Sequence, residues 1–590
     1  MIFKRLSEYL GKLEETTLRN KITQILAELF HESTPDEIGK LCYLLQGRVA
    51  PLFTAIEFGM ADKMMIKAIT YGMGVEDGRV LKVFQEEGDL GKAVEKIKNQ
   101  KSTTKNTYKK LNINKVYEIL YQVATSGGSG SQDKKITLLG NLLHDVDALS
   151  ARYIVRITLA KLRMGFSDMT ILDSLSWMIK GSKQLRPEIE RAYNVRPDLG
   201  FISETVQKHG IEGLKSTEPK VGIPILMARA ERMANSEDII LKIGKCAIEP
   251  KYDGFRLQIH YDGKDVKLFS RNLENVTNMY PDIIKGIKKQ IHKPAVIEGE
   301  AIGINLKTGE YLPFQETVQR KRKYDVELKA KEIPLHLFAF DCLIVGRENL
   351  LVKSYVERRN YLEKLIGKGE TVYIAQLEVV SNPIRLEELF QDAVTRGIEG
   401  VMAKKLEGIY RAGARDFNWI KYKRSYSGKL ADTIDAVVMG YDLGQGKRSG
   451  FGIGDFLIGV YDEKQDKFGT VTKIGTGLTD EEWREIKIRS DKLKVKTQPK
   501  NYEVDKIMSC DIWITPQIVV EIRADEITRS PVHTAGRVMG PSESGNSKEV
   551  KVAGFALRFP RLEKFRDDKK PQDATTLSEV EKMYKLQEKK

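Results

Sequence analysis

A lysine stands between two strand-like segments in IEPKYDGFRLQIH, residues 248–260. Behind the aspartate and glycine that follow it, apolar and polar residues alternate from Phe255 to His260, which predicts a half-buried strand. The residues before Glu249 also have strand character. Lys251 can therefore point into a cleft from the break between the two strands. A lysine becomes a nucleophile when desolvation or nearby cations deprotonate its amine.

Carboxylates and further cations occur downstream in short strand-like segments. Glu300 ends VIEGE, and Glu399 begins EGVMAKK. The segment WIKYK places Lys421 and Lys423 two residues apart, on the same face of a strand. Carboxylates that hold Mg²⁺ and lysines that neutralise phosphate oxygens indicate phosphoryl or nucleotidyl transfer. Each of these residues alone is more often a surface ion-pair partner, but their combination favours chemistry.

Other kinds of chemistry are excluded by their missing motifs. The chain contains no G-x-x-x-x-G-K-[ST] loop and no H-E-x-x-H segment, which excludes P-loop and zincin sites. The net charge of +15 favours a polyanionic partner, above all nucleic acid, although a solvated lysine-rich surface is the alternative. No apolar run approaches the roughly 18 residues of a membrane span, and the N-terminus lacks the core of a signal peptide. A soluble, intracellular protein is expected.

With 590 residues the chain is too long for one hydrophobic core. The pattern of helix-like and strand-like segments changes twice along it. We expect a multidomain fold. An all-α domain over residues 1–220 is followed by a mixed α/β domain over 221–427. Residues 428–590 show about five strands with Gly-rich turns, the pattern of a small closed β-barrel, and end in a short helix capped by Thr576 and Glu579.

A helix in the N-terminal region carries three arginines at helical spacing. In the segment LHDVDALSARYIVRITLAKLRMGF, we expect Arg152, Arg156 and Arg163 to share one face. Such a basic stripe suits DNA phosphates. An ordinary solvated face is an equally good interpretation.

The segment KYDGFR resembles the first motif, K-x-D-G-x-R, of the covalent nucleotidyltransferases, which are DNA ligases, RNA ligases and mRNA-capping guanylyltransferases. The segments similar to the remaining family motifs follow in order: FSRN, IEGE, FAFDCL, EGVMAK, WIKYK and RFPRLEKFRDDK. Flanking stretches resemble ATP-dependent DNA ligases of the archaeal and eukaryotic replicative type: PFQETVQRKRK, KIGTGLTDEEW and SARYIVRITLAKLRMG. The resemblance therefore extends over nearly the whole chain.

The resemblance implies a three-step reaction on nicked duplex DNA, in replication, repair and recombination. Lys251 would attack the α-phosphate of ATP and form a lysyl-AMP phosphoramidate. AMP would pass to the 5′-phosphate of the nick, and the 3′-hydroxyl would displace it. Glu300 and Glu399 would coordinate Mg²⁺, with Mn²⁺ as a substitute. Lys421 and Lys423 would hold the α-phosphate and help to keep the Lys251 amine unprotonated.

The resemblance also implies the nucleotide-binding residues and the domain types. Phe340 would stack on adenine, although its apolar neighbours alone favour a place in the core, and Glu249 would contact the base. Arginines would bind the ribose and phosphates, and a C-terminal pair would orient pyrophosphate: Arg256, Arg271 and Arg415 for the first role, Arg566 and Lys569 for the second. The domains would be a helical DNA-binding domain, a nucleotidyltransferase domain and an OB-fold.

The same residues and domains distinguish a DNA ligase from proteins with other functions. A guanylyltransferase has no need of a large helical DNA-binding domain, and an RNA ligase would usually lack this domain pairing. A non-catalytic nick-binding scaffold would have no need of the complete set of predicted catalytic residues. We expect a monomer that grips a nick by its phosphates. A sliding clamp is a further partner that the resemblance suggests, without a clear clamp-binding peptide, and ADP or NAD⁺ stay open as alternatives to ATP.

Overall fold

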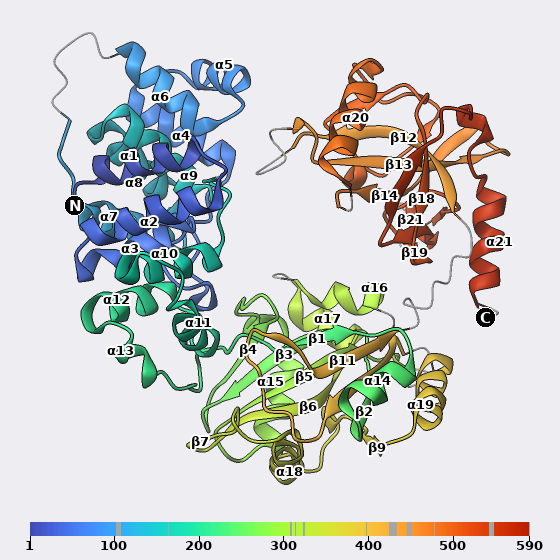
Figure 1. Ribbon diagram of the computed structural model, residues 1–590. Helices are drawn as coiled ribbons and strands as arrows, with labels where there is room; N and C mark the ends of the chain where they lie inside the picture. Colours follow the sequence, from blue (N-terminus) through green and yellow to red (C-terminus); the bar gives the residue numbers. More distant parts are fainter. Residues whose placement is uncertain are drawn as a thin grey trace. The chain divides into compact units, whose positions relative to one another are not determined.

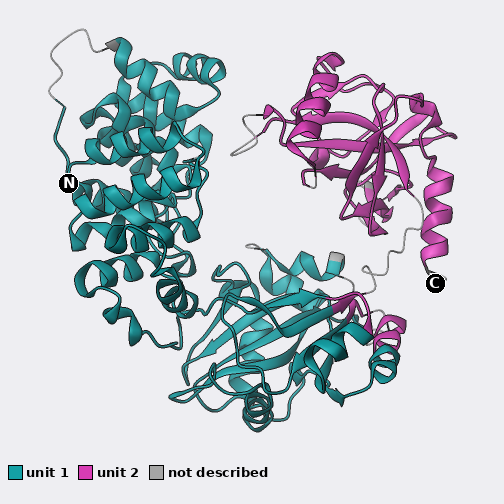
Figure 2. Cartoon of the chain, viewed as in Figure 1, with its two compact units in different colours: residues 1–232, 237–389, 401–421 teal, residues 233–236, 390–400, 422–590 magenta. Residues whose placement is uncertain are grey.

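The computed structural model describes residues 1–101, 108–162, 164–306, 310–312, 314–322, 325–396, 398–423, 433–444, 451–476, 478–541 and 548–588. The chain forms two compact units (Figure 2). The first unit comprises Met1–Arg232, Glu237–Leu389 and Val401–Lys421, and the second comprises Met233–Ser236, Phe390–Gly400 and Tyr422–Lys590. Within the described residues, no helix is both long enough and apolar enough to cross a membrane.

The N-terminal part of the chain is helical, as predicted (Figure 1). Its helices are α1 (Phe3–Glu14), α2 (Arg19–Glu32), α3 (Pro35–Leu45), α4 (Asp62–Met73), α5 (Asp77–Glu87), α6 (Leu90–Lys101), α7 (Ile113–Thr125), α8 (Ser131–Asp145), α9 (Ala148–Thr158), α10 (Asp168–Lys180), α11 (Arg186–Val195), α12 (Leu199–His209) and α13 (Glu212–Lys215), with a short 3₁₀ turn at Leu52–Thr54. Each amphipathic helix buries one face. In α7, for example, Val116, Leu120 and Val123 are buried at spacings of four and three.

Helix α9 is shorter than the sequence suggested. It begins at Ala148, where the Asp147 side chain caps the backbone N–H of Ser150, and it ends at Thr158. Ala160 then adopts a left-handed backbone conformation with φ of 53°, which a continuing helix cannot accommodate. The expectation that one helix continues to Arg163 is therefore wrong.

The middle of the chain contains two sheets and the helices that pack on them (Figure 1). In the described residues, one sheet has the strand order β1-β11-β10-β2-β9, and the other has the order β4-β3-β5-β6-β7 with β8 beside β6. The strands are β1 (Arg229–Arg232), β2 (Cys246–Pro250), β3 (Phe255–Tyr261), β4 (Val266–Ser270), β5 (Ala295–Gly303), β6 (Leu335–Val345), β7 (Glu348–Asn349), β8 (Val372–Ile374), β9 (Glu378–Val380), β10 (Gly400–Lys405) and β11 (Arg415–Lys423). The helices are α14 (Ser236–Ile243), α15 (Pro281–Gln290), α16 (Phe314–Thr317), α17 (Val326–Glu332), α18 (Tyr355–Leu365) and α19 (Pro383–Thr395), with 3₁₀ turns at Thr277–Met279 and Val318–Arg320.

Strand β3 is present as predicted, but both of its faces are covered. Gln258 and His260 are buried, so the expectation of a half-buried strand is wrong. The segment that links the helices to the sheets runs over this face. The Gly222 N–H donates to His260 Nδ1 at 3.0 Å, and the Ile225 N–H donates to Gln258 Oε1 at 2.7 Å. The linker backbone thus supplies hydrogen-bond partners for the buried side chains of Gln258 and His260. On a half-buried strand these side chains would have faced water instead.

The C-terminal part is rich in strands. One sheet of the described residues has the order β15-β17-β12-β13-β14-β16, and β18 joins β12 to β23. Two strand pairs, β19–β22 and β20–β21, accompany it. The strands are β12 (Ile434–Asp442), β13 (Asp455–Asp462), β14 (Lys467–Ile474), β15 (Lys494–Val495), β16 (Tyr502–Glu503), β17 (Ile512–Ile514), β18 (Val519–Arg523), β19 (Glu526–Ser530), β20 (Val538–Pro541), β21 (Lys548–Val552), β22 (Gly554–Arg558) and β23 (Arg561–Phe565).

The described residues of this part also form the helices α20 (Asp480–Asp491) and α21 (Leu577–Glu588) and 3₁₀ turns at Lys506–Met508 and Pro571–Asp573. The described residues of this part form more than the roughly five strands that the sequence predicts, and the single apolar segment IVVEIRADEI, for example, contributes to both β18 and β19. The predicted terminal helix is confirmed as α21. The Thr576 hydroxyl accepts from the Glu579 N–H at 3.3 Å, and Glu579 accepts from the Thr576 N–H at 2.8 Å, which is the predicted capping box.

Candidate active site

Lys251 lies where the chain crosses from one sheet to the other. It follows β2, a strand of the β1–β9 sheet, and precedes β3, a strand of the β4–β7 sheet. Gly254 is required at this crossing, because a Cβ there would lie 2.3 Å from the backbone oxygen of Ala301 in β5. The half-buried Lys251 side chain is thus held by a tight backbone approach between two rigid sheets.

Glu300 lies close to this lysine. It is directly opposite Arg256 in the antiparallel pairing of β5 with β3. Burial raises the pKa of the Glu300 carboxyl to about 7, although the neighbouring Lys251 and Arg256 act to lower it. The predicted nucleophile and one predicted metal ligand are therefore electrostatic neighbours in the structure.

Lys421 lies in the same electrostatic environment. Burial lowers the pKa of Lys421, and neighbouring cations lower it further: Arg415, Lys251, Arg271 and Arg232. Arg271 is affected in the same way, since burial and the charges of Arg256, Arg229 and Arg415 lower its pKa. These cations repel one another, and a bound polyanion would relieve that repulsion. The cluster is therefore suited to binding a polyanion.

Two arginines of this cluster were missed by the sequence interpretation. Strand β1 runs parallel to β11, so that Arg229 pairs with Arg415 and Arg232 pairs with Lys421. Both β1 side chains are exposed. Their only signal in the sequence is a spacing of three residues in RAER, which does not distinguish them from ordinary surface arginines.

Glu399 and Lys423 form an ion pair with each other. Both side chains are mostly buried, and Lys423 is at the end of β11. The sequence interpretation gave them separate roles, as a metal ligand and a phosphate ligand. In the structure each is the charge partner of the other.

Glu249, two residues before Lys251, forms a buried ion pair with Lys404. The Lys404 ammonium lies 2.7 Å from the Glu249 carboxylate, which also accepts a hydrogen bond from the Tyr355 hydroxyl. Burial lowers the pKa of Lys404. Lys404 was not singled out from the sequence, although it is part of the quoted segment EGVMAK.

Aromatic rings surround the Lys404 ammonium. It lies 4.7 Å from the centroid of the half-buried Phe340 ring and 4.5 Å from that of Trp419. The Arg256 guanidinium lies 5.4 Å from the Phe340 centroid and is fixed by a 2.7 Å hydrogen bond to Glu298. Phe340 is thus partly core, as its apolar neighbours indicated, and also borders this group of charged residues.

The comparisons with known proteins cover the whole chain. The family model described as ATP dependent DNA ligase domain matches residues 227–423. The models described as DNA ligase N terminus and ATP dependent DNA ligase C terminal region match residues 2–176 and 449–569. A probable DNA ligase of Dictyoglomus turgidum is 44% identical over 591 residues, which cover 100% of this chain and 98% of the relative. The chain belongs to the ATP-dependent DNA ligases.

Other similarities agree with this family. A DNA ligase of Hyperthermus butylicus is 40% identical, over 100% of this chain and 98% of the relative. The solved structure "Pmar-Lig_PreS3" has a TM-score of 0.52 at 16% identity, over 95% of this chain and 99% of that one, and so shares its fold. The ligase family confirms the predicted fold class: a helical N-terminal region, a nucleotidyltransferase middle domain and a strand-rich C-terminal domain with OB-like sheets. Nick sealing through an adenylate intermediate, with ATP, is the family's general activity.

The arginines of α9 do not form an open stripe on this ligase. Arg156 is 3% exposed, and its guanidinium lies 3.1 Å from Asp89 and 2.8 Å from Glu14. Arg152 binds Glu14 at 2.6 Å and Glu95 at 3.0 Å. Carboxylates from distant helices neutralise both arginines, and burial keeps Arg156 from reaching DNA. Its assignment as a phosphate contact is corrected to a structural role, and Arg163 lies outside the described residues.

Arg566 and Lys569 of the ligase C-terminal domain share one acidic partner. The Arg566 guanidinium lies 3.0 Å from Asp435, and the Lys569 ammonium lies 2.6 Å from the same carboxylate. The structure therefore brings these two predicted residues together.

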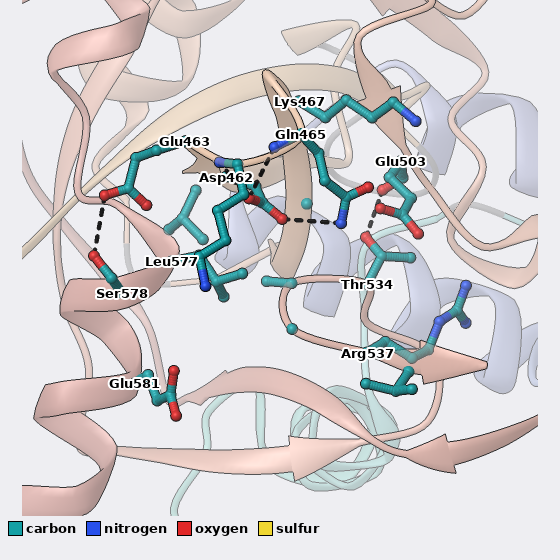
Figure 3. A pocket seen from close by; sticks show the side chains of 16 residues that line it. Asp462, Glu463, Gln465, Lys467, Glu503, Thr534, Arg537, Leu577, Ser578 and Glu581 are labelled. Carbon is teal, nitrogen blue, oxygen red and sulfur yellow. Dashed lines mark hydrogen bonds between the residues drawn. The ribbon is translucent and has the colours of Figure 1, made fainter. Parts of the chain in front are cut away.

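A pocket of about 240 Å³ lies elsewhere in the second unit, between the β13–β14 turn and α21 (Figure 3). Its charged groups are of both signs, and two of its carboxylates accept hydrogen bonds from neutral side chains that also line it. The Ser578 hydroxyl donates to Glu463 at 3.0 Å, and the Gln465 amide donates to Asp462 at 3.2 Å. None of the predicted site residues is among the described residues that line this pocket. The pocket is therefore separate from the candidate active site.

Proposed function

We propose that this protein seals 5′-phosphate/3′-hydroxyl nicks in duplex DNA, in replication, repair and recombination, with Lys251 as the nucleophile. The observation that carries the proposal is the position of Lys251 at the crossing of two sheets, where it is coupled electrostatically to Glu300 and Lys421. A nucleophilic amine among cations is suited to attack on a polyphosphate.

The reaction proceeds in three steps. In the first, Lys251 Nζ attacks the α-phosphorus of ATP, the P–N bond forms, the amine loses a proton, and the bond to pyrophosphate breaks. In the second, an oxygen of the 5′-phosphate at the nick displaces the lysine and takes the AMP. In the third, the 3′-hydroxyl attacks that phosphate, AMP leaves, and a phosphodiester bond results.

The cations around Lys251 bind the phosphates in these steps. Lys421 and Lys423 hold the α-phosphate. The surrounding arginines contact the ribose and the remaining phosphates: Arg256, Arg271 and Arg415, to which we add Arg229 and Arg232 from β1. This addition is supported by the register of β1 with β11 and by the effect of both β1 arginines on the neighbouring cations.

The adenine binds beside Phe340, whose ring stacks on it. Glu249 contacts the base or fixes its surroundings through Lys404. In support, the Lys404 ammonium lies against both the Phe340 and Trp419 rings. The ion pair with Glu249 holds the Lys404 ammonium against both rings. It thereby fixes the aromatic surface and places a positive charge beside it.

Glu300 and Glu399 would supply carboxylate oxygens to Mg²⁺ or Mn²⁺, as the resemblance to the family implies. The described residues contain no cluster of three or more acidic, His or Cys ligands, and Mg²⁺ commonly uses one or two carboxylates together with substrate phosphates. When bound, the ion offsets negative charge on the reacting phosphates. The raised pKa of Glu300 means that a nearby cation would favour its ionised form.

We propose the domain limits 1–220, 221–427 and 428–590 for the DNA-binding, nucleotidyltransferase and OB-fold domains. The helical domain would grip duplex DNA by its backbone, because a nick offers no sequence to read. The protein would act as an intracellular monomer, and a sliding clamp stays a prediction from the resemblance.

Covalent labelling tests the proposed function. Wild-type protein incubated with α-labelled ATP should retain the label, and nicked DNA should then release it as AMP while the strand is sealed. Lys251→Ala should not be labelled, whereas Lys245→Ala, at an exposed lysine before β2, should behave as wild type. Labelling by α-labelled GTP in preference to ATP would indicate a guanylyltransferase, and equal labelling of Lys251→Ala would exclude the assigned nucleophile.

A further inference from the structure

Asp435 of β12 binds the two cations assigned to pyrophosphate. Its carboxylate oxygens lie 3.1 and 3.0 Å from Arg566 Nη1, and one of them lies 2.6 Å from Lys569 Nζ. The Asp435 side chain is only 11% exposed. Among the described residues, it is the acid that contacts both of these cations.

The fold places the three residues together through neighbouring strands. Strand β18 lies between β12 and β23, with Asp435 opposite Glu521 and Glu521 opposite Lys564. Arg566 follows β23 directly, and its N–H donates to the Val519 oxygen at 2.8 Å. The Lys569 N–H donates to the Arg566 oxygen at 3.1 Å, which turns both side chains toward Asp435.

The backbone of Asp435 is held independently of its carboxylate. The Asp435 N–H donates to Thr575 Oγ1 at 2.9 Å, and the Thr575 N–H donates to the Asp435 oxygen at 2.9 Å. The strand position therefore does not depend on the contacts with Arg566 and Lys569. This arrangement lets the two cations leave the carboxylate while β12 stays in place.

The other acids near Arg566 are less suited to this role. Glu521 lies 3.3 Å from Arg566, and Asp568 lies 2.7 Å from it. Asp568 accepts two hydrogen bonds from Arg566, at 2.8 and 2.7 Å, but its side chain is 64% exposed, so water and salt screen this pair. Among the hydrogen bonds and ion pairs of the described residues, Lys569 bonds to neither of these acids, whereas Asp435 engages both cations at once.

We propose that Asp435 is a positioning residue that competes with pyrophosphate for Arg566 and Lys569. The inference rests on the proposed function and on the role that the resemblance implies for these cations, which is to orient the leaving pyrophosphate in the first step. Asp435 holds them when no diphosphate is present, and a diphosphate displaces the carboxylate when ATP or pyrophosphate binds. The same competition weakens the hold on pyrophosphate after the lysyl-AMP bond has formed and so promotes its release.

The reverse of the first step measures this competition directly. Adenylated protein and pyrophosphate form ATP and the free lysine, and the KM for pyrophosphate reports how well the two cations capture it. Asp435→Asn removes the competing charge with little change of shape. We expect this KM to fall about three- to tenfold, as for the loss of one charge-assisted contact, with little change in kcat. Sealing of a pre-adenylated nick, which involves no pyrophosphate, should stay within about twofold of wild type.

Two comparisons separate competition from a general structural effect. Asp568→Asn, which removes an exposed partner of Arg566, should leave the KM for pyrophosphate within about twofold of wild type. The effect of Asp435→Asn should disappear in a protein that also carries Arg566→Ala and Lys569→Ala, because the residues competed for are gone.

The outcomes also distinguish this inference from the proposed function. If wild-type protein forms no ATP from its adenylate and pyrophosphate, the proposed function fails. If wild type does so but Asp435→Asn leaves the KM unchanged or raises it, only the competition is overturned. Loss of the folded state in Asp435→Asn would also overturn it, because the carboxylate must be able to lose its cations without unfolding the domain.

Discussion

The Glu249 carboxylate and the Lys404 ammonium lie 2.7 Å apart, with 3% and 1% of their side chains exposed. They belong to adjacent antiparallel strands, β2 and β10, and Glu249 stands two residues before Lys251, the proposed nucleophile. Removing one member of so deeply buried a pair is costly, because Lys404 would lose its carboxylate partner and Glu249 would keep only the more distant Arg359, at 3.5 Å, of the cations that the structure describes. The pair therefore stabilises the position of Lys251 as well as bordering the proposed adenine site.

Removing one member of this pair should cost more than removing both. We expect Lys404→Met to destabilise the middle domain by about 3 kcal/mol, because the buried Glu249 carboxylate loses its partner at 2.7 Å and keeps, among the described residues, only Arg359, at 3.5 Å, as a cation. The double variant Lys404→Met with Glu249→Gln should regain a substantial part of that loss. Thermal unfolding followed by differential scanning calorimetry measures both effects. A double variant at least as unstable as the single one would contradict this account of the pair.

Arg229 should contribute to phosphate binding although it is far from the motif residues in sequence. We expect Arg229→Ala to reduce kcat/KM about tenfold, as for the loss of one charge-assisted phosphate contact. Self-adenylation and sealing of a pre-adenylated nick, measured separately, show whether the phosphate belongs to ATP or to DNA. The matched control is Arg347→Ala, an exposed arginine in the turn between β6 and β7. Equal small effects of the two changes would place Arg229 outside the site.

The C-terminal cations should matter only in the first step of the reaction. We expect Arg566→Ala with Lys569→Ala to lose self-adenylation but to seal a pre-adenylated nick at a substantial rate, because no pyrophosphate leaves in that reaction. Lys423→Ala should impair both reactions, since the α-phosphate is present throughout. Gel assays of labelled protein and of sealed strands measure the two steps. A C-terminal double variant that failed equally on the pre-adenylated nick would refute this division of roles.

Arg156 should affect stability and leave the salt dependence of DNA binding unchanged. Arg156→Ala removes the Arg156 cation from the buried Asp89 carboxylate, and we expect a loss of about 3 kcal/mol in the stability of the helical domain. The slope of log Kd against log salt concentration should stay that of wild type, because no phosphate contact is lost. The stability follows from calorimetry and the slope from binding to labelled nicked duplex. A shallower slope in a fully folded variant would restore Arg156 as a DNA contact.

The catalytic motifs could be found from the sequence because each is a short segment whose strand context is local. The alternation after Lys251 predicted β3, and WIKYK predicted the strand that carries Lys421. The burial of Gln258 could not be predicted, because the linker residue Ile225 that covers it is distant in sequence. Periodicity likewise could place Arg152 and Arg156 on one face of a helix.

Periodicity could not, however, show which other helices supply carboxylates to that face. Glu14 and Asp89 come from distant parts of the helical region and neutralise Arg156. Strand pairing sets the same limit for β1, because its parallel partner β11 lies far along the chain. Arg229 therefore joins the cluster through a register that local sequence does not encode.

The hydrogen bonds between the linker and β3 bear on how this ligase can be divided for laboratory work. Gly222 and Ile225 satisfy His260 and Gln258, and Gln258 donates in turn to Glu298 at 3.0 Å, the residue that fixes Arg256. A recombinant catalytic fragment that started at the edge of the family match, residue 227, would remove the backbone partners that Gly222 and Ile225 give to His260 and Gln258. The fragment should therefore begin before Gly222, so that it includes the linker residues that cover β3.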